Sequence, residues 1–307
     1  MDAITTRRID LPTATGADQP LWLDCREAGS AGAPLLVFLH GFPEAAFVWD
    51  RLMTRFAGRY HCVAPNLRGY AGSAAPAAVS AYRAEHLVGD VAGLIAALGG
   101  RAHAVIAHDW GGAVAWALAM QRPQLLQRLV ILNSPHPGVF LTALQQDAAQ
   151  QAASAYMNML RRPDAAQKLA ADDFALLWQL FTQFGGAPWL TDAQRAAYRQ
   201  AWSAGLEGPL NYYRASPLHP PTGPDDAVHT LRLPDAALQV RVPTDVVWGE
   251  ADTALPPALL DGLDRYVADL RIERLPGASH WLVHEQPEAV AAAIERALAR
   301  GDDGPAA

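Results

Sequence analysis

Short apolar runs without polar interruption alternate with helical stretches along much of this chain, and this alternation limits the fold more than any other feature. Strand-like runs occur at residues 35–39, 61–65, 103–107 and 128–132, and helical periodicity occurs at residues 85–98 and 111–120. Runs that are apolar throughout fit strands buried on both faces. The alternation of such strands with helices predicts a parallel sheet covered by helices on both sides.

The alternation stops after Pro135-His136-Pro137-Gly138. From about Val139 to Leu218 the chain shows amphipathic helical stretches without a convincing strand, and a Pro/Gly-rich connector closes this region at Ser216–Pro224. The first pattern then resumes, with strand-like runs at residues 244–248 and 270–275 and helices at residues 257–267 and from residue 287.

This change of pattern predicts an α/β core in two parts, residues 1–135 and 225–300. An all-helical cap is inserted between them as residues 136–224, and residues 301–307 form a frayed tail. Binding sites favour the interface between two such subdomains, so we expect the functional site between the core and the cap.

The composition excludes several classes of partner. With 307 residues, of which 51% are hydrophobic and 18% charged, the chain can build one large core with an insertion. The net charge of -7 argues against nucleic acid and against an anionic membrane surface as partners. No apolar run approaches the ~20 residues of a membrane span, and no apolar stretch follows Arg7 and Arg8 as in a secretory signal. Cys25 and Cys62 suit a reducing compartment, so we expect a cytoplasmic protein.

A pattern of small residues around an acid follows the run at residues 103–107, in Ala107-His108-Asp109-Trp110-Gly111. It has the form of the nucleophile elbow, a tight strand-to-helix turn that holds one side chain out at the edge of the sheet. The following helix points its N-terminal N–H groups at any developing anion. The alternative is that Asp109 only caps this helix. The motifs around it favour the elbow.

The segment His40-Gly41-Phe42-Pro43 follows the apolar run at residues 35–39. In this architecture the N–H after such a His-Gly pair supplies one donor of an oxyanion hole, and the N–H after the nucleophile supplies the other. We assign these donors to Phe42 and Trp110. A plain tight turn with a cis Phe42–Pro43 bond is compatible with that role.

A base and an orienting acid are expected in loops after later strands. His280 follows the run at residues 270–275 and is the candidate base. Asp252 follows the run at residues 244–248 and is the candidate acid, with Glu250 as the fallback. His284, one helical turn after His280, is expected to be solvated. No two histidines or cysteines have convincing metal-ligand spacing, and we expect no cofactor.

Taken together and in order, four motifs resemble the epoxide hydrolases of the α/β-hydrolase superfamily. They are His40–Glu44, Asn66–Ser73, His108–Gly112 and Gly277–Trp281. The resemblance extends over nearly the whole chain. It implies an α/β-hydrolase fold with a mostly parallel central sheet and a helical cap, and an epoxide and water as the small-molecule partners. A homodimer is left open.

An aspartate nucleophile limits the classes of substrate that the protein can react with. A carboxylate forms only an anhydride with an ester or amide, but it can displace a leaving group at an sp³ carbon. The product is an alkyl-enzyme ester on Asp109, which water activated by His280 then hydrolyses. The leaving group is then either the ring oxygen of an epoxide or a halide.

Two tyrosines of the cap favour the epoxide. The segment Glu207–Arg214 resembles the cap segment that carries one ring-opening tyrosine in this family, and the match falls on Tyr213. Tyr156 lies seven residues before Pro163, which resembles the spacing of the family's other cap tyrosine. Two phenols, with an unperturbed pKa of about 10, stay protonated and can donate to a leaving alkoxide. The alternative is that both only pack in the cap core, as we expect for Tyr212.

Haloalkane and haloacetate dehalogenases share the aspartate nucleophile and are the alternative. The Trp110 indole would suit a halide. However, Phe42 stands where haloalkane dehalogenases often have an Asn donor, while Trp110 and Ala113 stand where haloacetate dehalogenases have arginines. Tyr156 stands where the latter have a halide-binding His.

A non-catalytic ligand-binding member of the fold ranks third, because every catalytic position carries a competent residue. Four aromatic residues of the cap either line an apolar pocket or form its core: Trp178, Phe181, Phe184 and Trp189.

Overall fold

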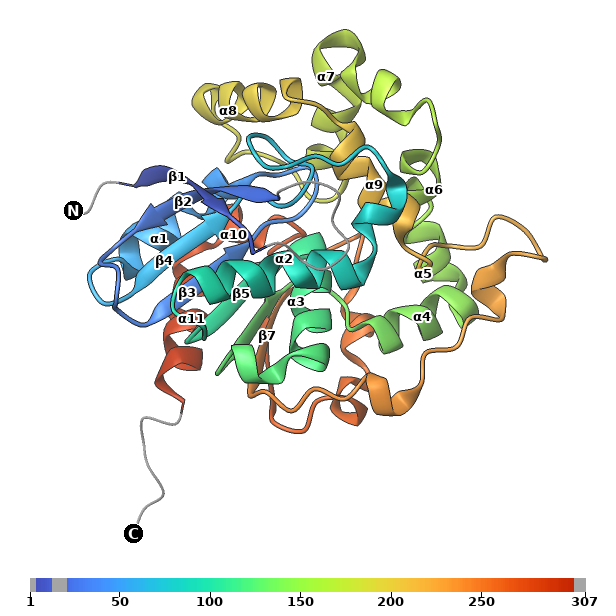
Figure 1. Ribbon diagram of the computed structural model, residues 1–307. Coiled ribbons are helices and arrows are strands. Elements are labelled where there is room, and N and C mark those ends of the chain that lie inside the picture. The colour runs from blue at the N-terminus through green and yellow to red at the C-terminus, as the bar shows by residue number, and fades with distance from the viewer. Residues whose placement is uncertain (1–3, 13–20, 301–307) are drawn as a thin grey trace.

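An eight-stranded sheet forms the centre of the protein (Figure 1). The computed structural model describes residues 4–12 and 21–300, so the tail predicted at residues 301–307 lies outside the described residues. The strand order is β1-β2-β4-β3-β5-β6-β7-β8. The bounds are β1 Thr5–Asp10, β2 Trp22–Ala28, β3 Leu35–Leu39, β4 His61–Pro65, β5 Ala104–His108, β6 Leu129–Leu132, β7 Thr244–Gly249 and β8 Leu270–Leu275.

The sheet is mostly parallel, as the sequence predicts. From β4 to β8 in spatial order all neighbours pair in parallel, whereas β2 pairs antiparallel with both β1 and β4. Every residue of β3, β4, β5 and β6 is buried, which explains why these strands are apolar without alternation. The sequence contains no comparable signal for β1, because this edge strand is largely exposed and polar.

Helices cover both faces of the sheet. In Figure 1, α2 and α3 pack together on one face, and α1 packs against α11 on the other. The helices of the core are α1 Asp50–Phe56, α2 Ala84–Ala97, α3 Asp109–Gln121, α10 Leu282–Glu285 and α11 Pro287–Ala299. Short 3-10 helices are η1 Ala46–Trp49, η2 Val79–Tyr82, η3 Pro123–Leu125, η4 Ala227–His229, η5 Asp235–Ala237, η6 Pro257–Leu260 and η7 Leu263–Arg265.

The helix predicted at residues 257–267 is wrong. The structure has η6 and η7 there, and Gly262 between them adopts a left-handed conformation with φ of 75°. A left-handed residue ends the run of helical hydrogen bonds, so the two short helices cannot merge into one.

The described residues between β6 and β7 form helices and no strand. We call α4–α9 the helical insertion, with bounds α4 Pro137–Gln146, α5 Ala148–Ala153, α6 Tyr156–Leu160, α7 Ala165–Gln183, α8 Asp192–Ser203 and α9 Glu207–Ala215. Figure 1 shows α6, α7, α8 and α9 grouped above the sheet. Within α7 the backbone of residues 172–174 is left-handed, which divides this helix into two helical parts.

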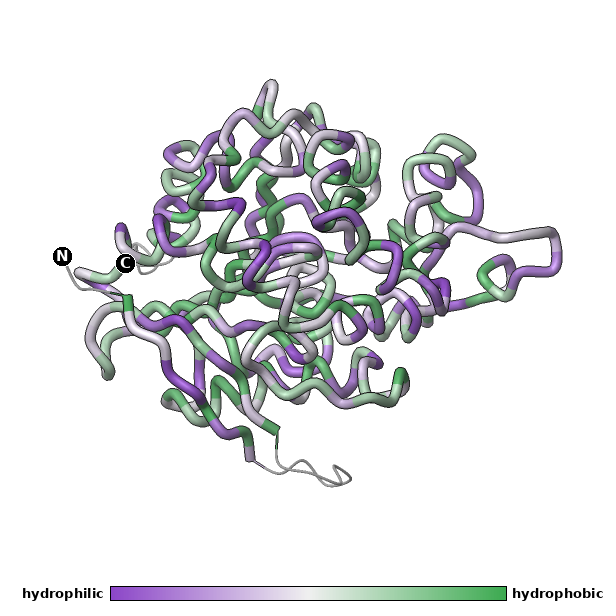
Figure 2. The backbone as a smooth tube through the Cα atoms, turned by 90° about the horizontal axis from the view of Figure 1, so that it is seen from above, coloured by the Kyte–Doolittle hydropathy of each residue, from purple (hydrophilic) through white to green (hydrophobic). Residues whose placement is uncertain are grey.

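Hydrophobic residues gather in the interior, and Figure 2 shows the hydrophilic stretches mostly toward the outside. Within residues 4–12 and 21–300, no helix has the length and apolar character that crossing a lipid bilayer would require.

The topology decides where a site can form. The chain places β4 on one side of β3 and then returns to place β5 on its other side. The chain therefore leaves β3 towards α1 on one face of the sheet and leaves β5 towards α3 on the other, and ligands bind at such a point in open α/β sheets. The register aligns Leu39 with Ala107 at the ends of these two strands, so both loops begin at the same level.

Candidate active site

Asp109 lies on a tight turn between β5 and α3. Its φ of 50° is left-handed, which is unfavourable for a residue with a side chain and holds the carboxylate away from the strand. Small neighbours make this turn possible. A Cβ on Gly41 would lie 2.4 Å from Asp109 Oδ1, and one on Gly111 would lie 2.4 Å from the carbonyl oxygen of Leu39. The structure therefore gives Asp109 the surroundings that the elbow pattern predicts.

The predicted oxyanion loop, residues 40–44, begins where β3 ends and reaches this carboxylate. The Phe42 N–H donates a 2.7 Å hydrogen bond to Asp109 Oδ1. The Phe42–Pro43 bond is cis. Trp110 is in the first turn of α3, whose N–H groups have no partner within the helix. Both predicted donors therefore lie next to the nucleophile candidate.

His280 lies between two carboxylates. Its Nδ1 is 2.7 Å from Asp252 Oδ2, and its Nε2 is 3.6 Å from Asp109 Oδ2. All three side chains are largely buried. Glu250 is exposed, so the structure brings Asp252 and not the fallback acid to the imidazole.

A residue that sequence reasoning left aside holds the acid in place. The Asn133 Nδ2 donates to Asp252 Oδ2 at 2.6 Å, and the Gly249 N–H donates to Asn133 Oδ1 at 2.7 Å. The other carboxylate oxygen, Oδ1, accepts the backbone N–H groups of Ala254 and Leu255, both at 2.8 Å. The only signal for Asn133 in the sequence is its place directly after the buried strand β6.

These contacts determine the protonation states of His280 and Asp109. Burial alone lowers the pKa of His280, but the Asp252 and Asp109 carboxylates outweigh it and raise the pKa to about 10. Burial likewise opposes ionisation of Asp109, yet the hydrogen bond and positive charge of His280 keep its pKa below the usual value. At neutral pH the pair is therefore an imidazolium beside a carboxylate.

Tyr156 and Tyr213 lie next to each other, carried by α6 and α9 of the helical insertion. Their ring centroids are 6.4 Å apart, and the Tyr213 ring lies 5.3 Å from Phe42 and 5.0 Å from Trp110. Burial, and among other charges that of Asp109, raise the pKa of both phenols. Both hydroxyls therefore keep their protons and can donate. The neighbouring Tyr212 instead donates to the Arg68 carbonyl oxygen at 3.0 Å, the packing role expected for it.

The prediction that His284 is solvated is wrong. Its side chain is 8% exposed, its Nε2 is 2.6 Å from Glu44 Oε1, and its ring stacks on Trp189 at 4.0 Å. The Tyr198 hydroxyl donates to the same oxygen at 2.8 Å, and His108 Nδ1 lies 3.3 Å from the other. Burial opposes the Glu44 charge, but the two histidines hold its pKa well below the usual value.

The structure separates the four aromatic residues of the insertion. Trp178, Phe181 and Trp189 pack with one another and with Tyr198, Trp202, Trp281 and His284. Only Phe184 of the four has ring contacts with Tyr156, at 4.8 Å, and His280, at 6.4 Å. Three of the four therefore pack within the insertion and against Trp281 and His284 of the core, and Phe184 borders the site.

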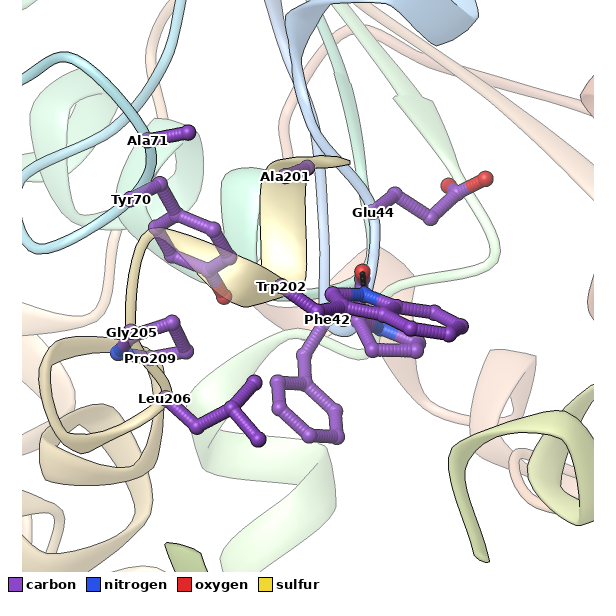
Figure 3. A pocket seen from close by; sticks show the side chains of 10 residues that line it. Phe42, Glu44, Tyr70, Ala71, Ala201, Trp202, Gly205, Leu206 and Pro209 are labelled. Atoms are coloured by element: carbon purple, nitrogen blue, oxygen red, sulfur yellow. Dashed lines mark hydrogen bonds between the residues drawn. The ribbon is translucent and has the colours of Figure 1, made fainter. Parts of the chain in front are cut away.

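A small pocket lies behind Phe42, between the oxyanion loop and the segment that joins α8 to α9 (Figure 3). Leu206 and Trp202 form its wall on the insertion side, and the Glu44 carboxylate points away from it. The Tyr70 hydroxyl lines the pocket from the core and is buried without a hydrogen-bond partner among the described residues. Across residues 4–12 and 21–300, no three His, Cys, Asp or Glu side chains are grouped as a metal site requires.

Comparisons with known proteins agree with this geometry. The family described as the alpha/beta hydrolase fold matches residues 34–287. Epoxide hydrolase 3 of Mus musculus is 32% identical over 289 residues, a match that covers 92% of this chain and 75% of the relative. Epoxide hydrolase 4 of Homo sapiens is 32% identical over 273 residues, covering 86% of this chain and 72% of the relative.

Solved structures give the same result. One described as a novel epoxide hydrolase of the alpha/beta hydrolases superfamily, from metagenomes of hot environments, superposes with a TM-score of 0.86 at 35% identity. That match covers 97% of this chain and 99% of the other. An epoxide hydrolase of Bacillus megaterium in complex with an inhibitor superposes with a TM-score of 0.83 at 30% identity, covering 91% and 97%. The chain therefore belongs to the α/β-hydrolase fold family and, within it, to the epoxide hydrolases.

Proposed function

We propose that the protein hydrolyses an epoxide to a vicinal diol through an alkyl-enzyme ester on Asp109. One observation carries the proposal above the others. Two phenols, Tyr156 and Tyr213, lie side by side, and the Tyr213 ring packs against Trp110 and against Phe42, whose N–H donates to the Asp109 carboxylate. A leaving alkoxide needs such donors, whereas an ester or amide substrate would need a different nucleophile.

In the first step Asp109 Oδ2 attacks a ring carbon of the epoxide. The bond from that carbon to the ring oxygen breaks, and the oxygen leaves with the electron pair and takes a proton from one of the two phenols. The Phe42 N–H already holds Oδ1, which supports its becoming the carbonyl oxygen of the ester. The resulting phenolate regains its proton at the expense of the His280 imidazolium, through solvent, which leaves His280 neutral.

In the second step neutral His280 takes a proton from water, and the hydroxide adds to the ester carbon. The negative charge develops on Oδ1, next to the N–H groups of Phe42 and Trp110. The intermediate then expels the alcohol oxygen, which takes the proton of the new carboxyl group. The diol is released, and the resting carboxylate and imidazolium are restored. The sum is epoxide plus water giving diol.

We further propose that residues 136–224 act as the cap of this site. The helical insertion supplies both phenols, and its α8 contacts the oxyanion loop directly, since the Trp202 indole donates to the Pro43 carbonyl oxygen at 2.7 Å. A cap that holds the two phenols next to Asp109 also excludes bulk water, so that the ester is not exposed to it before His280 becomes neutral.

A dehalogenase would use the same nucleophile, but the two phenols do not fit its reaction. A halide leaves as a stable anion and needs no proton, so a pair of buried phenols would have no task in that reaction. Their position beside Asp109 therefore favours the epoxide.

The test follows one oxygen atom. The protein, in excess over styrene oxide, is allowed a single turnover in H₂¹⁸O. Because Oδ2 becomes part of the product, the diol should carry no ¹⁸O, and mass spectrometry should find one ¹⁸O on Asp109. In a His280→Gln variant the ester should instead accumulate as one substrate mass on the peptide containing Asp109. An ¹⁸O-labelled diol in the first turnover, or no diol from any epoxide tested, would overturn the proposal.

A further inference from the structure

The C-terminal end of α7 touches the loop that carries His280, and all of its hydrogen bonds to that loop and to the Asp252 loop use backbone carbonyls of the insertion. The Trp281 indole donates to the Phe181 carbonyl oxygen at 3.0 Å, and the His280 N–H donates to that of Phe184 at 3.4 Å. From the neighbouring loop, the Thr253 hydroxyl donates to the Gln183 carbonyl oxygen at 3.3 Å.

The backbone of His280 is therefore held from two sides. Its carbonyl oxygen lies 2.9 Å from His108 Nε2, and because a carbonyl can only accept, that nitrogen is the donor. Its N–H is bonded to Phe184 of the helical insertion. The core thus supplies one partner of the His280 peptide unit and the insertion supplies the other.

The Phe184 side chain lies between one proposed proton donor, Tyr156, and the proposed base, His280. It is buried, and its ring contacts both Tyr156 and the His280 imidazole. A shift of this one residue would therefore change the position of the base relative to one proton donor.

Gly185 makes this approach possible. A Cβ at this position would lie 1.9 Å from Ser279 Oγ and 2.5 Å from Ser279 Cβ. The backbone of Gly185 is not left-handed, so the contact with Ser279 is the reason that this position requires glycine. The adjacent Gly186 is exposed, and a Cβ there would meet only Pro188 Cδ, at an ordinary 3.7 Å.

We propose that Phe184 and Gly185 are positioning residues for His280, so that the helical insertion places the general base as well as the phenols. This inference rests on the proposed function. His280 Nε2 must reach both the ester carbon and a water molecule, and displacements of about 1 Å can slow an enzyme by roughly 10²-fold. Attack by Asp109 on the epoxide does not need His280 as a base. A displaced His280 should therefore slow ester hydrolysis much more than ring opening.

The experiment compares Gly185→Ala with its matched control, Gly186→Ala. Rapid quenching and intact-protein mass spectrometry measure the rates of ester formation and ester loss with styrene oxide. In Gly185→Ala we expect ester loss to slow by about 10- to 10²-fold, so that the ester accumulates, while its formation changes little. Gly186→Ala should behave like the parent protein. Equal effects of the two substitutions, or equal slowing of both steps in Gly185→Ala, would overturn the inference.

A second measurement needs no turnover. The Nδ1–H of His280, bonded to Asp252 at 2.7 Å, should give a low-field proton NMR signal that disappears in His280→Gln. Gly185→Ala should shift or broaden this signal and Gly186→Ala should not. An unchanged signal in Gly185→Ala would refute the positioning role, whether or not the parent protein makes diol. A shifted signal in a protein that makes no diol would overturn the proposed function alone.

Should Gly185→Ala not fold, Phe184→Leu keeps the backbone carbonyl and removes the ring contact. It should slow ester loss more than ester formation, by a smaller factor. A Phe184→Leu protein with both rates unchanged would likewise refute the role.

Discussion

Replacing Asp252 with asparagine should stop the second chemical step by changing the tautomer of His280. The amide must keep its oxygen at the place of Oδ1, because the N–H groups of Ala254 and Leu255 donate there. Its NH₂ group then takes the place of Oδ2, opposite the Nδ1–H of His280 and the amide donor of Asn133. Three donors would face one another without an acceptor. His280 can relieve this only by moving its proton from Nδ1 to Nε2.

A His280 protonated at Nε2 cannot take a proton from water at that atom. The loss should therefore approach the whole contribution of a general base, about 10²–10⁴-fold in the rate of ester hydrolysis. Ring opening needs the Asp109 carboxylate and the phenols, so its rate should change much less. Stability should also fall, by about 1.5–3 kcal/mol for the lost charge-assisted hydrogen bond.

The assay follows the ester by rapid quenching and mass spectrometry, as a function of time after mixing with styrene oxide. Glu250→Gln is the control, because Glu250 is exposed and lies in the same loop. The reasoning is refuted if Asp252→Asn hydrolyses the ester at the parent rate, or if Glu250→Gln accumulates ester and Asp252→Asn does not.

Three further predictions concern the phenols, pH and a buried ion pair. Tyr156→Phe and Tyr213→Phe should each slow ring opening by up to about 10²–10⁴-fold and together nearly abolish it, while any turnover of an alkyl bromide persists; equal losses on both substrates would contradict the role. Because the pKa of His280 is raised to about 10, its ion pairs stabilise the fold fully below pH 6.5, and this stabilisation is lost as the pH rises through about 10. The melting temperature of the parent protein should therefore fall more over that interval than that of His280→Gln. Asp90→Ala should destabilise the protein by about 3–5 kcal/mol in chemical denaturation, because it strands Arg68, whose Nε lies 2.6 Å from Asp90 Oδ2 in a buried pair; a loss below about 1 kcal/mol would show that water reaches the site.

Local patterns in the sequence determined the parallel half of the fold. The run Leu35–Leu39 is β3 residue for residue, and the run His61–Pro65 is β4. A parallel strand buried on both faces must be apolar throughout, so it is visible without knowledge of its neighbours. The elbow around Asp109 is similarly local, since a tight turn needs small residues at fixed positions beside it.

Features with weak or distant partners were not predictable. The edge strand Thr5–Asp10 is exposed and polar, so it has no apolar signal. A single left-handed glycine, Gly262, divides the helix expected at residues 257–267, and propensity alone does not fix a backbone conformation.

The tertiary structure alone decided which polar and aromatic side chains meet. His284 looks like a solvated helix residue, yet it is buried against Glu44, 240 residues away in sequence. Asn133 supports Asp252 across 119 residues, and Phe184 is the one aromatic residue of its group that reaches His280. Amphipathic patterns record that a side chain is buried or polar, but not which partner it meets. That choice depends on how the carboxyl ends of the strands and the helical insertion come together in space, which no local pattern in the sequence encodes.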